Sequence, residues 1–296
     1  MDQNAQMPTV LNGSWYLRIP LSVWNWTIIS ALVVTVYWHV VIKLVNAWLE
    51  LPDYSHGALV PIFACYLVWA KRKTLLRTKI EPTWTGIFVV ALALGFLLLG
   101  EFGAELFLSR ISLIMLCAGL VLAFGGWQLL KELRFALLVL LLAVPIPTIV
   151  FNQIALPLQS LASKLATALL HFMGVTALRL GNIIELPSMR LEVAEACSGI
   201  RSLVSLFTLS IFYGYFLEKT YLRRVALALA SIPIAIAANA VRIFGTGMCI
   251  QYWDADKALG FFHEFSGWVM FLVSLGCLSI VHYAMRLFPH RRRGAS

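Results

Sequence analysis

The chain has 296 residues, of which 60% are hydrophobic and only 12% are charged, and its mean hydropathy is +0.84. Soluble domains are about 45–50% apolar and about 25% charged, so this composition excludes an ordinary soluble enzyme and predicts an integral membrane protein. The formal net charge of +9 does not indicate a nucleic-acid-binding protein, because the basic residues form short runs between apolar segments.

No Gly- or Pro-rich linker, low-complexity run or internal repeat divides the chain, which predicts one multi-pass membrane domain over residues 24–288. We expect residues 1–23 to form a cytoplasmic tail without a cleavable signal peptide. Residues 289–296 are expected to form a basic cytoplasmic tail.

Apolar runs predict about eight transmembrane helices, since about 20 apolar residues cross the hydrocarbon core. The expected spans are residues 24–45, 57–70, 84–100, 106–125, 135–150, 200–217, 225–244 and 266–288. The predicted fold is therefore an all-α, polytopic membrane bundle.

The loop charges predict the orientation of this bundle. Basic segments at residues 71–79, 131–134, 218–224 and 290–293 alternate with acidic loops that are poor in Lys and Arg. The positive-inside rule places the basic segments and both termini in the cytoplasm. The acidic loops then face outward, and residues 151–196 form an extracytoplasmic insert.

Two elements are predicted within this insert. Over residues 152–171, apolar positions recur at helical spacing opposite polar ones, which indicates an amphipathic helix in the plane of the membrane interface. The apolar positions are Ile154, Leu158, Leu161, Leu165 and Leu169, and the polar ones are Gln153, Gln159, Ser163, Lys164 and Thr167. The following "NIIELPSMRLEVAE" predicts a short β-hairpin. Both elements either cap the bundle or dock a substrate.

Three chemically capable residues are predicted at the outer face: Cys197 before the sixth span, Arg242 at the end of the seventh, and His263 before the eighth. Cys197, with Ser198 beside it, follows the carboxylate of Glu195 and precedes a helix, whose N-terminus stabilises a thiolate nucleophile. The alternative role for this thiol is a disulfide bond with Cys249.

Arg242 suits the stabilisation of an oxyanion, because a guanidinium keeps its proton. Asn239, one turn earlier, is expected to share its face as a second donor. The alternative is an arginine whose side chain only reaches toward the interface. His263 is expected to take the thiol proton and return it to the leaving amine, with Glu195 or Glu264 orienting the ring.

A fourth polar segment, "DYSHGALVP" from Asp53, either caps the second helix or binds substrate through Asp53 and His56. A metal site built from His56, His263 and Cys197 is conceivable, but no CxxC or HExxH spacing supports it. We therefore expect neither a metal nor another cofactor.

The segments "ACSGIRSL", "NAVR" and "HEFSG", with "DYSHGALVP" upstream, resemble the exosortases and their archaeosortase relatives. These are multi-pass membrane enzymes that process surface proteins in a sortase-like manner. The resemblance implies that Cys197, Arg242 and His263 are the catalytic cysteine, arginine and histidine. Histidine at the last position resembles the bacterial form, which implies a location in the bacterial inner membrane.

The resemblance also implies the substrate, a protein with a C-terminal sorting tail. Such a tail has a Pro-Glu-Pro-like motif, a transmembrane helix and a basic cluster. The expected activity is that of a cysteine protease or transpeptidase acting through a thioester, with membrane lipid and sorting tails as partners and no nucleic acid. Two other classes remain open from the residues: a transporter or lipid-linked glycan carrier, which would place charges at mid-depth, and a non-catalytic assembly factor for polysaccharide export.

Overall fold

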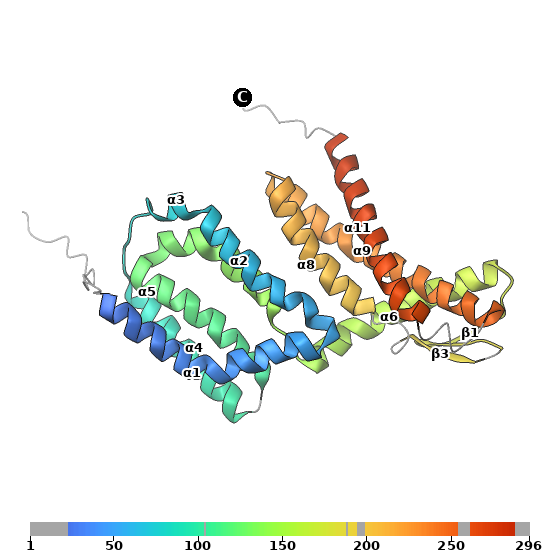
Figure 1. The fold of residues 1–296 in the computed structure, drawn as a ribbon, viewed down its shortest axis with the longest axis horizontal. Helices are drawn as coiled ribbons and strands as arrows, with labels where there is room; N and C mark the ends of the chain where they lie inside the picture. Colours follow the sequence, from blue (N-terminus) through green and yellow to red (C-terminus); the bar gives the residue numbers. More distant parts are fainter. Residues whose placement is uncertain (1–22, 104, 188, 194–198, 254–260, 288–296) are drawn as a thin grey trace, which may run out of the picture. The chain divides into compact units, whose positions relative to one another are not determined.

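The computed structural model describes residues 23–103, 105–187, 189–193, 199–253 and 261–287 (Figure 1). In chain order its elements are α1 (Val23–Glu50), η1 (Pro52–Ala58), α2 (Leu59–Ala70), α3 (Arg72–Leu75), α4 (Trp84–Phe102), α5 (Leu106–Leu140), η2 (Leu141–Ala143), α6 (Thr148–Phe172), β1 (Leu178–Leu180), β2 (Ile183–Glu185), β3 (Arg190–Glu192), α8 (Gly199–Leu217), α9 (Tyr221–Tyr252) and α11 (Phe261–Leu287). Helices thus dominate the described part of the chain.

Five helical segments among the described residues are long and apolar enough to cross a membrane, which agrees with an all-α integral membrane protein. They are Trp24–Glu50, Trp84–Phe102, Leu106–Ala143, Tyr221–Tyr252 and Phe265–Leu287. The expected second and sixth spans correspond to shorter helices, α2 with 12 residues and the apolar stretch Arg201–Leu217 of α8. A count of eight spans therefore stays a prediction.

The predicted fifth span, residues 135–150, is wrong as a single helix. Helix α5 runs through the expected loop at residues 131–134, and the chain leaves helical geometry after Ala143. Pro145 and Pro147 follow, and proline lacks the N–H that a continuing helix requires. The break in α5 lies earlier, at Gly126, whose φ of 81° and ψ of −176° interrupt the helix. Only glycine adopts such a backbone conformation without strain.

The chain divides into two compact units, residues 1–44 with 64–141 and residues 45–63 with 142–296. The core of the first unit contains Tyr37 and Val40 of α1, Ala93 and Leu97 of α4, and Leu116 of α5. Small residues bring α4 and α5 close together, and a Cβ on Gly86 would collide with the backbone of Ala123.

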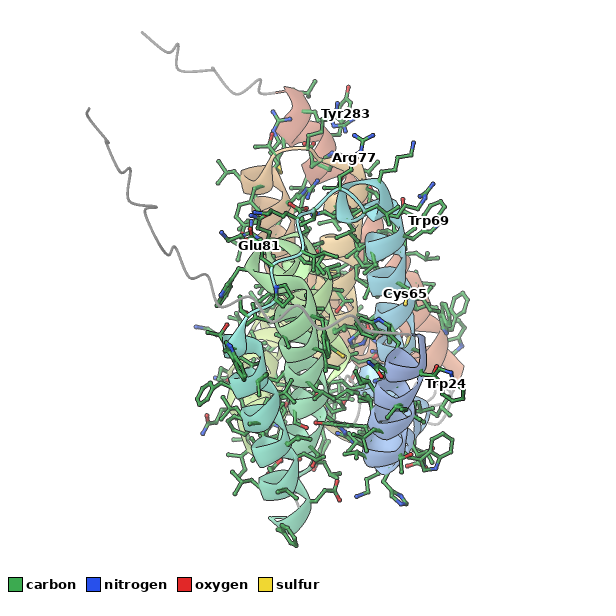
Figure 2. The ribbon with its side chains drawn as sticks, turned by 90° about the vertical axis from the view of Figure 1, so that its left-hand side faces the viewer. Trp24, Cys65, Trp69, Arg77, Glu81 and Tyr283 are labelled. Atoms are coloured by element: carbon green, nitrogen blue, oxygen red, sulfur yellow. The ribbon has the colours of Figure 1, made fainter. Side chains whose placement is uncertain are left out.

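The surface of the first unit is apolar and aromatic, as expected for a lipid-facing surface. Figure 2 shows Trp24 and Trp69 projecting from the ribbon, and they are 76% and 59% exposed. Tryptophan is enriched where a membrane protein meets the headgroup region. The integral membrane character predicted from composition is therefore also visible in which side chains are left exposed.

The second unit contains helices α6, α8, α9 and α11 and the β-strands. One core cluster joins α6, the strands and α9 through residues such as Ala166, Ile184, Leu191 and Ile243. A second cluster joins Leu206 of α8, Leu227 and Ala235 of α9, and Leu278 of α11. Helix α9 is therefore the element around which the others of this unit pack.

Helix α6 covers the region predicted to be amphipathic, but its two faces differ from the prediction. The leucine stripe, including Leu161, Leu165 and Leu169, is exposed, whereas Ser163 and Thr167, expected on the polar side, are buried. Each of these hydroxyls bonds a carbonyl of the preceding helical turn, and Ser163 also donates to Gly181 O at 3.0 Å. Small, internally satisfied side chains thus pack against the protein, and the leucines face the surroundings.

The strands form one antiparallel sheet in the order β1-β2-β3. Ile184 pairs with Leu191 across β2 and β3, the segment in which a two-stranded hairpin was expected, and β1 adds a third strand. Arg179 donates to Ser160 Oγ at 3.2 Å and so fastens the sheet to α6. Strand β3 ends at Glu192, five residues before Cys197.

Candidate functional site

Arg242 of α9 contacts the start of α11. Its Nε donates to Ser266 Oγ at 3.3 Å, and its side chain is half-buried. Gly267 leaves room beside the guanidinium, because a Cβ there would lie 3.4 Å from one of its terminal nitrogens. The segments "NAVR" and "HEFSG", separated by 20 residues or more, are therefore in contact, and His263 lies in the first turn of the same helix.

Arg242 does not lie at the end of its helix, where it was expected. Helix α9 continues from Arg242 to Tyr252, a rise of about 15 Å at about 1.5 Å per residue. Ile243 and Ile250, in this continuation, are buried in the core shared with α6 and the sheet. The guanidinium thus extends from within a packed helix toward α11. This position disfavours the alternative in which the side chain only extends toward the membrane interface.

A second contact joins the polar segment of η1 to the start of α8. Arg201 Nε donates to Asp53 Oδ1 at 3.3 Å, and the two side chains are 49% and 30% exposed. Arg201 lies four residues after Cys197. The segment "DYSHG" is therefore held beside the helix that the candidate cysteine precedes.

His56, in the segment expected to cap a helix or bind substrate, is buried. It is 9% exposed, and neither ring nitrogen has a hydrogen-bond partner among the described residues. Burial lowers the pKa of His56 below its ordinary value of 6.5, and the nearby carbonyls of Leu142 and Asp53 oppose this only partly. The imidazole is thus neutral near pH 7.

The surrounding segment is firmly anchored. Trp48 Nε1 donates to Ala143 O at 2.7 Å, and the backbone N–H of Ile146 donates to the Tyr54 hydroxyl at 3.1 Å. Gly57 is required here, because a Cβ would collide with the Trp48 ring. These contacts hold His56 and Asp53 in a fixed position relative to residues 143–146.

Asn239 faces different neighbours from Arg242. Its side chain is 6% exposed and lines a small pocket with residues of α6 and α8, including Gln159 and Leu203. Arg242 instead contacts α11. The expectation that both side chains aim at one spot therefore stays a prediction.

The remaining predicted site residues lie outside the described residues. These are Cys197, Glu195 and Ser198, together with the side chains of His263 and Glu264. The conceivable metal site rests on two of them and stays untested. Cys249, the alternative partner of Cys197, is a free cysteine packed partly buried against the core of α6, the sheet and α9.

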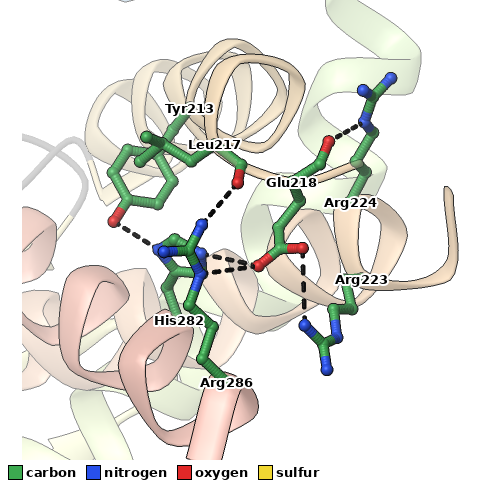
Figure 3. A network of polar contacts seen from close by, with 7 residues as sticks. All are labelled: Tyr213, Leu217, Glu218, Arg223, Arg224, His282 and Arg286. Carbon is green, nitrogen blue, oxygen red and sulfur yellow. Dashed lines mark hydrogen bonds and ion pairs between the residues drawn. The ribbon is translucent and has the colours of Figure 1, made fainter. Parts of the chain in front are cut away.

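A polar cluster that sequence reasoning did not single out lies at the other end of the same helices (Figure 3). Glu218, which follows α8, is 5% exposed and accepts from His282 Nε2 at 2.8 Å and from Arg286 Nε at 3.2 Å. Arg223 lies 3.7 Å from its second oxygen, and the Tyr213 hydroxyl is 2.8 Å from His282 Nδ1. This cluster ties α8, α9 and α11 together.

The charges around Glu218 decide its protonation. Burial by itself would raise the pKa of this carboxyl, but the hydrogen bonds from His282 and Arg286 and the charge of Arg223 outweigh it and lower the pKa below 4.5. Glu218 is thus a buried carboxylate that is stabilised by cationic neighbours.

A family model described as transmembrane exosortase (Exosortase_EpsH) matches residues 48–280, about four-fifths of the chain. The chain belongs to the transmembrane exosortase family. Neither the curated proteins nor the solved structures gave a match. The matched range contains every site residue predicted from the sequence, from Asp53 to Glu264. Of the Glu218 cluster it contains Tyr213, Glu218 and Arg223, whereas His282 and Arg286 lie beyond its end.

Three residues of this exosortase take part in the contacts above without having been assigned a role from the sequence: Arg201, Ser266 and Gln159. Arg201 and Ser266 lie within the quoted motifs, so their proximity to Cys197 and His263 was a usable signal. Gln159 was placed only on the polar side of α6. Its position beside Asn239 depends on the packing of α6 on α9, which no local pattern encodes.

Proposed function

We propose that this exosortase is a membrane-embedded cysteine protease or transpeptidase that cleaves C-terminal sorting tails of exported proteins. The contact between Arg242 and Ser266 carries the proposal, because it brings the arginine segment to the helix on which His263 lies. The ion pair of Asp53 and Arg201 adds the helix that follows Cys197. The membrane orientation proposed is that of the loop charges, with this site on the outer face.

In the proposed reaction, the Cys197 thiolate attacks the scissile carbonyl carbon and forms a C–S bond. Arg242 stabilises the resulting oxyanion, and the intermediate collapses with cleavage of the C–N bond. His263, which holds the thiol proton, gives it to the leaving amine. A thioester remains, and an acceptor amine or water attacks it and regenerates the thiol.

Ser266 has a supporting role in this scheme. Its hydroxyl accepts from Arg242 Nε, which helps to fix the plane of the guanidinium beside the start of α11. Membrane insertion of both partners fixes the depth of the scissile bond and raises its effective concentration near the thiol.

The decisive experiment substitutes the candidate nucleophile. Cys197→Ala should abolish release of the tail from a co-expressed substrate, while the protein still accumulates in the membrane. Cys249→Ala is the matched control, because this thiol is packed against a core of the same unit and should be dispensable for processing. Normal processing by Cys197→Ala would refute the proposal.

A further inference from the structure

The segment that joins α2 to α4 in the first unit is held against α5 at both of its ends. Lys71 Nζ lies 2.9 Å from the carboxylate of Glu132 and also donates to the backbone carbonyl of that residue at 3.0 Å. At the other end, the backbone N–H of Glu81 donates to Gly125 O at 3.2 Å, and the Glu81 side chain pairs with Lys79 at 2.6 Å. Glu81 and Glu132 are thus each paired with a lysine.

Between these two ends, backbone hydrogen bonds continue the turns of α3. The N–H of Leu76 donates to Arg72 O and the N–H of Arg77 donates to Thr74 O, both at 3.0 Å. Positions four apart in a helical run are neighbours, so the exposed side chains of Lys73 and Arg77 lie on one face (Figure 2). Like charges at this spacing repel each other, and neither cation has an acidic partner among the described residues.

A third cation, Arg72, is held by an exposed tryptophan. Its Nη1 donates to Trp69 O at 3.0 Å, and its guanidinium carbon lies 4.2 Å from the centre of the Trp69 ring. Tryptophan side chains are typical of the headgroup region of a membrane, and a guanidinium stacks favourably on the indole ring. Arg72 is therefore held at the depth at which lipid phosphates lie.

Two large apolar side chains are exposed among these cations. Leu76 is 87% exposed and Ile80 is 66% exposed. The segment directly precedes the candidate span Trp84–Phe102, so it lies where that helix leaves the hydrocarbon core. At this interface apolar side chains enter the acyl boundary, and lysine and arginine attract anionic headgroups.

The charge and the exposed apolar groups together define the occupant. A soluble anion would satisfy the cations but leave Leu76 and Ile80 in water, whereas an uncharged lipid would cover these side chains and leave the repulsion between the cations. We propose that residues 69–84 form a binding site for an anionic phospholipid, with its phosphate at Lys73 and Arg77 and its acyl chains against Leu76 and Ile80. This site does not depend on the proposed enzymatic function.

The first test compares two pairs of exposed cations. Lys73→Gln with Arg77→Gln removes the proposed pair, and Lys164→Gln with Lys219→Gln removes the same charge from the second unit. The full chain in an uncharged detergent is titrated with phosphatidylglycerol, phosphatidylcholine or inorganic phosphate, and the thermal midpoint reports binding. Phosphatidylglycerol alone should raise the midpoint, with saturation. The first pair of substitutions should weaken its apparent affinity about 25-fold, about fivefold for each cation, and the second pair should match the wild type.

Three outcomes of this titration would overturn the site. Equal stabilisation by phosphatidylcholine would show that the charge of the lipid is irrelevant, and equal stabilisation by inorganic phosphate would show that the ligand is a soluble anion. Equal weakening by both pairs of substitutions would show that only the net charge of the protein matters. Because all four side chains are exposed, the midpoint without added lipid should stay that of the wild type in both variants.

The second test addresses the acyl chains. Leu76→Gln should weaken the binding of phosphatidylglycerol about tenfold, because a leucine that lipid covers is replaced by a polar side chain. Leu178→Gln is the matched control, since this leucine of β1 is 59% exposed and belongs to the second unit. Unchanged affinity in Leu76→Gln, or an equal loss in Leu178→Gln, would overturn the proposed contact between the acyl chains and this segment.

Discussion

Buried polar groups near the two ends of helices α8, α9 and α11 differ in how fully they are hydrogen-bonded. At one end, a single carboxylate, Glu218, collects hydrogen bonds from His282 and Arg286 and the charge of Arg223. Toward the other end, about 21 Å away along α8 from Leu217 to Leu203, the buried amide oxygens of Gln159 and Asn239 have no described donor.

This difference suggests different roles for the two regions, one in stability and the other in the proposed activity. A fully connected buried network holds its elements in one arrangement and offers nothing to a ligand. Unsatisfied acceptors weaken the fold unless water or another molecule binds them. The Glu218 cluster therefore holds the helices together, and the opposite end is where we propose that the substrate binds.

The largest expected effect is on catalysis at Arg242. Arg242→Ala should lower kcat for tail release about 100- to 1000-fold, the usual cost of removing one oxyanion donor. Thermal stability should change little, since Arg242 is only half-buried. The measurement is turnover of a tail-bearing substrate in membranes.

Arg286→Ala is the matched control at the other end. It removes one donor from Glu218 and should lower the thermal midpoint while leaving kcat near the wild-type value. If the two variants showed the reverse pattern, with Arg286 controlling kcat and Arg242 controlling stability, the division between the two ends would be wrong.

The largest expected effect on stability is at Glu218. Glu218→Ala leaves His282 and the neighbouring arginines without their carboxylate and should cost about 3–5 kcal/mol of unfolding free energy, as for the loss of one partner in a buried ion pair. Denaturation in detergent measures this change. The kcat of the molecules that remain folded should stay near normal.

An exposed ion pair provides the comparison for Glu218. Glu101 lies 3.5 Å from Lys43, and the two side chains are 39% and 46% exposed. Glu101→Ala should cost about 0–1 kcal/mol, because exposed pairs are screened by solvent. Equal losses in Glu101→Ala and Glu218→Ala would show that burial does not set the strength of the cluster.

The two ends should also respond differently to acid. The lowered pKa of His56 means that the unfolded chain binds a proton first, so His56 lowers stability as the pH falls below 6.5 and through its folded-state pKa. The lowered pKa of Glu218 has the same sign, but its effect begins only below pH 4.5.

His56→Phe should therefore remove the loss of thermal stability that begins below pH 6.5 and retain the further loss that begins below pH 4.5. The aromatic ring keeps the volume beside Tyr54. The measurement is the thermal midpoint as a function of pH. An unchanged curve between pH 6.5 and pH 4.5 would show that another group causes the loss there.

Composition and periodicity predicted the membrane class, the helical character and the site segments, because hydropathy and short motifs are local properties of the sequence. These patterns did not predict the features that depend on how the helices pack together. The faces of α6 are an example: leucines were expected to define one side and hydroxyls the other, but small side chains allow closer packing on α9, so Ser163 and Thr167 are buried.

The candidate site shows the same limit. Arg242 and the segment that carries His263 were predicted to lie together, and Ser266 provides that contact. The buried amide of Gln159 and the cationic neighbours of Glu218 could not be predicted, because each depends on residues from distant helices. Charged residues in a loop, such as Glu218, are ordinarily solvated, and only the fold reveals that this one is enclosed.

The smallest expected effect sharpens the comparison at the site end. Asp53 and Arg201 are both partly exposed, so Asp53→Asn and Arg201→Gln should each change stability by less than about 1 kcal/mol. Their coupling, measured by a double-mutant cycle on tail release, should exceed their coupling in stability, because the pair positions η1 beside the helix that follows Cys197 rather than holding the fold together. If the coupling in stability were larger than the coupling in turnover, this pair would serve to stabilise the fold, as the Glu218 cluster does. The two ends would then not differ in role.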